Sequence, residues 1–323
     1  MHAKSAVFAL VLGLSVSTPA AAYTYQSTVS KGCHERIVTE AIRALRGADN
    51  VATVRPSAND RALIHDLPFD LDPDVRDLTG ASLAVGVRDN DLHGNGPNEL
   101  DSIAQLHGNP ELQREHCLRA PEQDEPDGTK RALEDCKAFI REKVSAALEG
   151  LDQNGKPDAG RTIELEVTLT FRGRTDVELP LYWIEIGRAL HAMEDSFTHT
   201  YRSADHTRVR VTENYSDYVN TDFEESRDGP AHRSQMDECE DLDEYRARNL
   251  QLAKQASYDI LHLTVDPSLA TREAKMAALE TTLHTYLDYE PGCTAANQWC
   301  NAPENGYDVD ASHVELAEPI QPT

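Results

Sequence analysis

The chain has 323 residues and a formal net charge of −25 at pH 7, with 56 Asp and Glu against 31 Lys and Arg. This acidic balance excludes a broad nucleic-acid-binding surface and disfavours non-specific binding to anionic polymers, although bound cations would reverse the sign of the charge locally. The length suffices for one large domain with a substantial hydrophobic core, or for two small ones.

Residues 1–22 have the features of a secretory signal peptide. Lys4 precedes the apolar run 6–14, and Ala20–Ala22 supply the small residues expected before a cleavage site. We therefore expect the mature chain to begin at Tyr23 and the protein to be secreted or periplasmic. No other stretch approaches the roughly 20 apolar residues of a membrane span, so no transmembrane segment is expected.

The cysteines predict disulfides. Six cysteines, an even number, lie beyond residue 22, and in an exported protein they favour three bridges. Many pairings are possible, but Cys293 and Cys300 bracket a short loop and are the easiest pair to close. No C-x-x-C spacing is present, which argues against thiolate metal ligands. The six are Cys33, Cys117, Cys136, Cys239, Cys293 and Cys300.

The first half of the chain predicts two long helices separated by loops. Apolar spacing favours a helix over 33–45, with His34 in its first turn and Gly47 as its stop. Residues 50–128 are rich in Asp, Asn, Pro and Gly and predict long ordered loops with short helices near 59–66 and 98–106. A second long helix is expected over about 129–150.

The second half predicts a hairpin, a central helix and two further helices. Strict alternation over 163–171 is typical of a half-buried strand, one arm of a small β-hairpin, and a second alternating patch covers 209–211. Helices are expected over about 243–263 and 271–288. We expect one mostly helical metal-binding domain over 23–300 and a disordered tail over 301–323.

The central helix, expected over 183–202, carries two stripes. His191, Asp195 and His199 recur every four residues, which places them on one face. His191 and His199 would lie roughly 12 Å apart along the axis, too far to share one tetrahedral ion. The spacing therefore favours two metal ions bridged by Asp195, and the alternative is a solvated face on an amphipathic helix. The apolar stripe consists of Trp183, Ile186, Leu190, Met193, Phe197 and Tyr201.

The order of these features resembles the zinc-dependent phospholipase C and S1/P1 nuclease superfamily. The shared order is an N-terminal residue, a His on an early helix, an Asp and a His in loops, and a His-x-x-x-Asp pair on a central helix. The resemblance implies a mainly α, phospholipase C/P1 nuclease-like helical domain with long loops and a small β-hairpin insertion. It also implies two to three zinc ions, with the main-chain amine and carbonyl of Tyr23 and the side chain of His34 among their ligands.

The remaining ligands follow from the same resemblance. Asp195 would bridge, and His191 would share a zinc with Asp89 or Asp91 and with a loop histidine. His116 is the favoured loop histidine and His93 the alternative.

His199 would be the first ligand of the last zinc site, and at this site the chain departs from the family pattern. Family members have a longer segment between the bridging Asp and the next His. At the offsets where the phospholipases carry a His and an acid, this chain has Glu213 and Asp217, and His206 is a nearby substitute.

The resemblance implies hydrolysis of a phosphodiester by water, with Asp89 or Asp91 as a ligand or general base. We expect a secreted zinc-dependent phosphodiesterase of phospholipase C type, with a phospholipid as substrate. One alternative is an S1/P1-type nuclease, which would need aromatic platforms for bases, and the chain has only six Phe and two Trp. The other is a non-catalytic exported metal-binding protein with a degraded site. The oligomeric state is left open.

Overall fold

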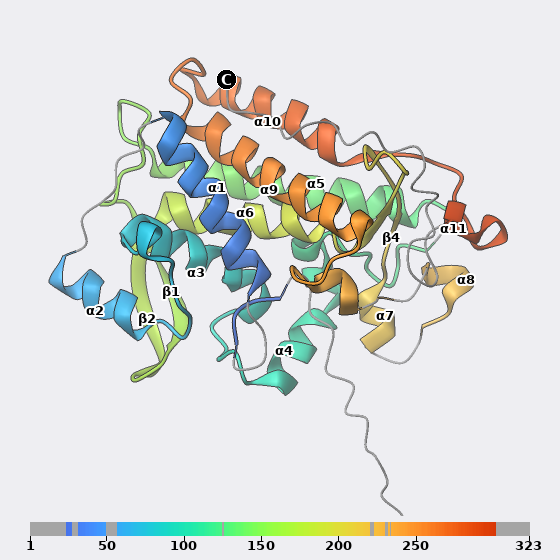
Figure 1. The fold of residues 1–323 in the computed structure, drawn as a ribbon, viewed down its shortest axis with the longest axis horizontal. Coiled ribbons are helices and arrows are strands. Elements are labelled where there is room, and N and C mark those ends of the chain that lie inside the picture. The colour runs from blue at the N-terminus through green and yellow to red at the C-terminus, as the bar shows by residue number, and fades with distance from the viewer. Residues whose placement is uncertain are drawn as a thin grey trace, which may run out of the picture.

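The computed structural model describes a mostly helical protein with two small sheets (Figure 1). The segment predicted as a signal peptide, Tyr23 and the tail beyond 301 lie outside the described residues. The described ranges are 24–27, 32–49, 57–124, 126–219, 223–229, 232 and 234–301.

Helices account for most of the regular structure of the chain. The α-helices are α1 (Cys33–Asp49), α2 (Ala58–Asp66), α3 (Leu78–Leu92), α4 (Leu100–His107), α5 (Gly128–Ala147), α6 (Leu181–Asp195), α7 (Tyr215–Val219), α8 (Glu225–Asp228), α9 (Glu244–Val265), α10 (Arg272–Tyr286) and α11 (Gln298–Asn301). The 3₁₀ turns are η1 (Pro73–Val75), η2 (Pro110–His116), η3 (Leu148–Gly150), η4 (Ser234–Asp237) and η5 (Ala295–Asn297). The strands are β1 (Thr162–Leu169), β2 (Gly173–Pro180), β3 (Thr200–Arg202), β4 (Arg208–Thr212) and β5 (Asp288–Tyr289).

Helix α6 lies at the centre of the main hydrophobic core, in contact with α3, α5 and α9. The predicted apolar stripe is buried, from Trp183 in α6 at 3% exposure to Phe197, just beyond the end of this helix, at 0%. Figure 1 shows α10 and α9 side by side above α6, with α1 crossing in front. The helices predicted over 243–263 and 271–288 are α9 and α10, and they complete this core.

The predicted helix over 183–202 is wrong beyond residue 195, because α6 ends at Asp195. Three hydroxyls bond to main-chain carbonyls at this end: Ser196 to Met193 O at 2.6 Å, Thr198 to Asp195 O at 3.1 Å and Thr200 to Ser196 O at 2.5 Å. Such bonds compete with the helical ladder. The chain therefore turns here, and residues 200–202 form strand β3 instead.

The prediction of loops across 50–128 missed helix α3, although it placed short helices close to α2 and α4. Almost every residue of α3 is buried, so it has no amphipathic stripe to reveal it. Its glycines also lower its helix propensity. A Cβ on Gly86 would lie 2.4 Å from Ile184 O, so the glycine is needed for close packing on α6. Gly47 does not end α1, which continues to Asp49.

The alternating segment forms the predicted β-hairpin, and its second arm is β2. The strands pair antiparallel from Thr162↔Pro180 to Leu169↔Gly173, and Gly173 takes a positive φ of 67° in the turn. The hairpin covers a second apolar cluster with α2 and α3, at the left of Figure 1. The patch over 209–211 belongs to β4, which lies between β3 and β5.

The prediction of three disulfides is confirmed, including Cys293–Cys300. The other two are Cys33–Cys239 and Cys117–Cys136. Among the described residues, none of the helices has both the length and the apolar character needed to cross a membrane.

Candidate metal centre

Three groups of buried His and Asp side chains could each hold a metal ion. Within each group the ligand atoms lie within 4.8 Å of one another. We call these the first group (His34, His191, Asp195), the second group (Asp91, His116, His191) and the third group (His199, His232, Asp237). The solvated face considered for His191 and Asp195 is therefore wrong, since both are 0% exposed.

Asp195 joins the first group to the second. Its Oδ1 lies 3.1 Å from His34 Nε2, and its Oδ2 lies 2.9 Å from both His191 Nε2 and His116 Nδ1. Ligands about 2.0–2.1 Å from a tetrahedral zinc are about 3.3 Å apart. The spacing of these atoms is therefore close to that of ligands around shared ions.

The second group adds Asp91 from α3. Its Oδ1 lies 3.7 Å from His191 Nε2 and 3.9 Å from His116 Nδ1. It also lies 3.1 Å from Nε2 of His107, a residue at the end of α4 that sequence reasoning missed. The one acid within four residues of His107 is Glu111, and Gly108 and Pro110 end the helix between them, so no periodic pattern pointed to His107.

The third group depends on two further residues that were missed, His232 and Asp237. His232 Nε2 lies 2.9 Å from Asp237 Oδ2, and its Nδ1 lies 2.6 Å from Glu213 Oε2. Glu213 thus orients His232, as carboxylates do for metal-binding histidines. Both missed residues belong to an acidic, irregular segment, where the only signal was a His followed five residues later by an Asp.

Three further histidine rings are also bonded at the nitrogen that faces away from their group. His191 Nδ1 lies 2.7 Å from Val87 O, and His199 Nδ1 lies 3.0 Å from His116 O. A ring that donates from Nδ1 to a carbonyl keeps the lone pair of Nε2 for a metal. His34 Nδ1 contacts Glu194 Oε2 at 2.7 Å, which fixes that ring in the same manner.

Burial and neighbouring charges shift the pKa values of these side chains in opposite directions. Burial lowers the pKa of His199 to about 3 and raises that of Asp237 to about 7. Burial alone would raise the pKa of Asp195, but the charges of His191 and His34 hold it well below its usual value. His199 is therefore neutral and Asp195 ionised at pH 7, the forms that bind cations, whereas Asp237 is only partly ionised at this pH and would release a proton when a cation binds.

The other predicted ligands lie outside the three groups. The Asp89 carboxylate bonds to Arg188 at 2.6 Å, and His93 contacts Glu115 at 3.2 Å. His206 Nδ1 lies 2.7 Å from Asn249 Oδ1. The Asp217 carboxylate accepts a bond from Asn214 at 2.7 Å.

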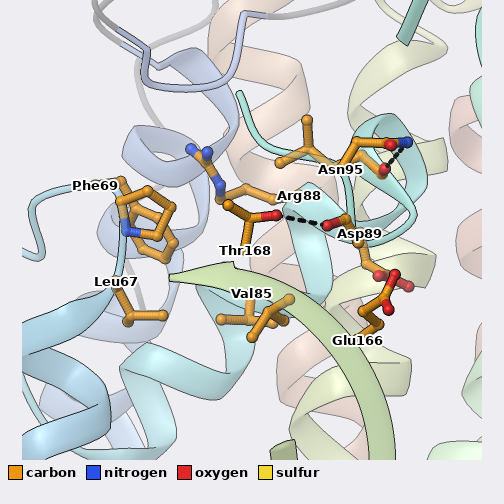
Figure 2. A pocket seen from close by; sticks show the side chains of 12 residues that line it. Leu67, Phe69, Val85, Arg88, Asp89, Asn95, Glu166 and Thr168 are labelled. Carbon is orange, nitrogen blue, oxygen red and sulfur yellow. Dashed lines mark hydrogen bonds between the residues drawn. The ribbon is translucent and has the colours of Figure 1, made fainter. Parts of the chain in front are cut away.

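Asp89 instead lines a separate cavity between α3, β1 and residues 67–69 (Figure 2). Its walls include the apolar side chains of Leu67, Phe69 and Val85. The guanidinium of Arg88 stacks 4.4 Å from the Phe69 ring and pairs with Glu35 outside the cavity lining. Since Asp89 is also paired, the cavity offers no set of metal ligands.

His206 gives a prediction for the pH dependence of folding. Burial lowers its pKa to about 4, against about 6.5 in an unfolded chain. Between these values only the unfolded chain binds the proton, so stability falls as pH falls from about 6.5 to 4. The contribution is at most about 3 kcal/mol.

The matched variant is His206→Asn, because Asn tolerates the positive φ of 61° at this position. The free energy of unfolding should be measured in urea between pH 4 and 7.5. We expect the variant to lose less stability on acidification than the unmodified protein. Parallel curves would contradict the assignment.

Comparisons with protein-family models, with curated proteins and with solved structures find no match. The chemistry of the three groups is therefore the basis on which a function can be proposed.

Proposed function

We propose that the protein is an exported zinc-dependent phosphodiesterase of phospholipase C type. The observation that carries the proposal is Asp195, whose two oxygens contact His34, His191 and His116 in the interior. One buried carboxylate between several imidazoles is a donor set suited to closely spaced zinc ions.

The donor atoms of the groups support bound cations. Asp91 Oδ2 and Asp237 Oδ1 are buried and, among the described residues, accept no hydrogen bond. A buried carboxylate oxygen without a partner is costly, and a metal ion would remove that cost. The mixture of imidazole and carboxylate donors favours zinc over the harder cations magnesium and calcium.

Zinc ions held here would polarise the phosphoryl oxygens and lower the pKa of a bound water toward about 7. Of the two acids considered as general base, Asp91 is favoured because it lies in the second group, whereas Asp89 is paired with Arg188. The three disulfides support the exported location, since such bonds persist in oxidising compartments.

The proposal retains Tyr23 as an N-terminal ligand. Support comes from the residue that follows it. The Thr24 amide donates to Asp237 O at 3.2 Å, and its carbonyl accepts from the amide of Cys33. Thr24 is thereby held between Asp237 and Cys33, the residue that precedes His34.

The test is a metal analysis followed by a substrate screen of the purified mature protein. We expect two to three equivalents of zinc in the protein. We also expect it to hydrolyse a soluble phosphodiester, to lose this activity on chelation and to regain it when zinc is added. Phosphatidylcholine and single-stranded DNA should then be compared as substrates. A preference for DNA would favour the nuclease alternative, and zinc without turnover would favour a non-catalytic metal-binding protein. A protein without zinc would overturn the proposal.

A further inference from the structure

The tip of the β-hairpin presents one aromatic side chain to solvent. Phe171 is 76% exposed and Leu100 is 49% exposed, and among the described residues these are the two large hydrophobic side chains that are exposed. Leaving a Phe in water forgoes about 1.5–3 kcal/mol of burial. An exposed Phe at the end of a projecting element is therefore a candidate contact surface.

The exposure of Phe171 is built into the turn. Its amide donates to Asp66 Oδ1 at 2.7 Å, and the amide of Thr170 donates to Asp66 O at 2.7 Å. Arg172 Nε donates to Asp66 Oδ2 at 2.6 Å. Asp66 is itself 5% exposed, so a buried anchor in α2 fixes three successive turn residues and holds the Phe171 ring outward.

The charges around the tip select the kind of partner. The Arg172 side chain is half exposed but its guanidinium is paired with Asp66, so the tip combines one exposed aromatic ring with little net charge. Behind it the strands carry exposed acids directly opposite each other, Glu164↔Glu178 and Glu166↔Asp176. The neighbouring Arg174 is paired with Glu166 at 3.3 Å and with Glu99 at 2.9 Å, so its charge is also compensated by acids. A polyanion such as single-stranded nucleic acid needs a basic track beside its stacking aromatics, and these acids would repel it.

A zwitterionic lipid surface carries no net charge, so its binding requires no basic track. Aromatic side chains partition into the interfacial region of a bilayer, where the ring is buried and neighbouring polar groups stay hydrated. We propose that the hairpin tip, residues 170–172, docks the protein on zwitterionic phospholipid surfaces through Phe171. This inference deepens the proposed function and rests on it for the role of the contact, which is to bring the enzyme to aggregated substrate.

The tip can carry its own reporter. The two native tryptophans, Trp183 and Trp299, are each 3% exposed and give a constant background. Phe171→Trp adds an exposed indole at the tip. With phosphatidylcholine vesicles, its emission should shift to shorter wavelength as the ring enters the interface.

Binding is measured by sedimentation with the same vesicles. Phe171→Ser should weaken partitioning by about tenfold or more. Leu100→Ser, the matched change at the other exposed hydrophobic position, should leave partitioning unchanged. Phe171→Trp should bind at least as well as the unmodified protein.

Several outcomes would overturn the inference. These are an unshifted emission with phosphatidylcholine, equal loss in both Ser variants, or binding to anionic vesicles alone. Quenching by single-stranded DNA without a response to lipid would assign the tip to nucleic acid. A blue shift that grows with protein concentration in the absence of lipid would assign it to a second copy of the chain.

Turnover of a soluble phosphodiester separates this inference from the proposed function. Phe171→Ser should hydrolyse the soluble diester normally and lose activity only on vesicles. If no form of the protein hydrolyses the soluble diester, the proposed function fails, while the vesicle assay still reports on the tip. If the soluble diester is hydrolysed but the tip ignores lipid, the docking inference fails alone.

Discussion

Replacing Asp195 by Asn is expected to remove at least one of the bound zinc ions and to abolish phosphodiester hydrolysis. Asn keeps the shape of the side chain but removes the charge that faces three imidazoles. The metal-free variant should also be destabilised by about 3–5 kcal/mol, since buried imidazoles lose their anionic partner. Zinc content by mass spectrometry, the rate of phosphodiester hydrolysis and urea unfolding after chelation measure the three effects.

Asp89→Asn is the matched control for Asp195→Asn. The substituted carboxylate lies outside the three groups and pairs with Arg188. We therefore expect full zinc content and little loss of activity. Full zinc occupancy in Asp195→Asn, or equal zinc loss in both variants, would contradict the assignment of the bridging ligand.

Replacing Gly187 by Ala is expected to destabilise the packing of α6 on α3 and thereby to weaken zinc binding, without changing any ligand. A Cβ at Gly187 would lie 2.7 Å from Leu83 O and from the carbonyl carbon of Gly86, both backbone atoms of α3. The two helices must then separate, which costs about 1–3 kcal/mol. Because α3 carries Asp91 and α6 carries His191, the same movement should weaken zinc binding in the second group.

Gly47→Ala serves as the control for the glycine change. Gly47 lies within α1, and a Cβ there would meet no atom within 4 Å. Ala should stabilise this helix by about 0.5–1 kcal/mol. If packing causes the effect, the thermal midpoint should fall for Gly187→Ala and rise for Gly47→Ala, and a zinc-competition titration should show weaker binding for Gly187→Ala alone. Equal behaviour would show that the contact between α3 and α6 tolerates a methyl group.

The sequence by itself determined the features that local periodicity and counting can report. Apolar spacing identified the core stripe of α6, alternation identified β1, and six cysteines predicted three disulfides. The four-residue spacing of His191 and Asp195 singled out two members of the first group. Each of these signals lies within a few turns of chain, where side-chain direction follows from the backbone.

Only the tertiary structure decided which distant residues come together in the three groups of metal ligands. His34 meets Asp195 across 161 positions, counted from the residue numbers, and Cys33 is bonded to Cys239 at a separation of 206. His232 and Asp237 have no periodic pattern because an irregular segment places them, and α3 is hidden because it is buried on every side. The end of α6 was decided by hydroxyls that bond to carbonyls after Asp195, and so the position of His199 could not follow from helical spacing.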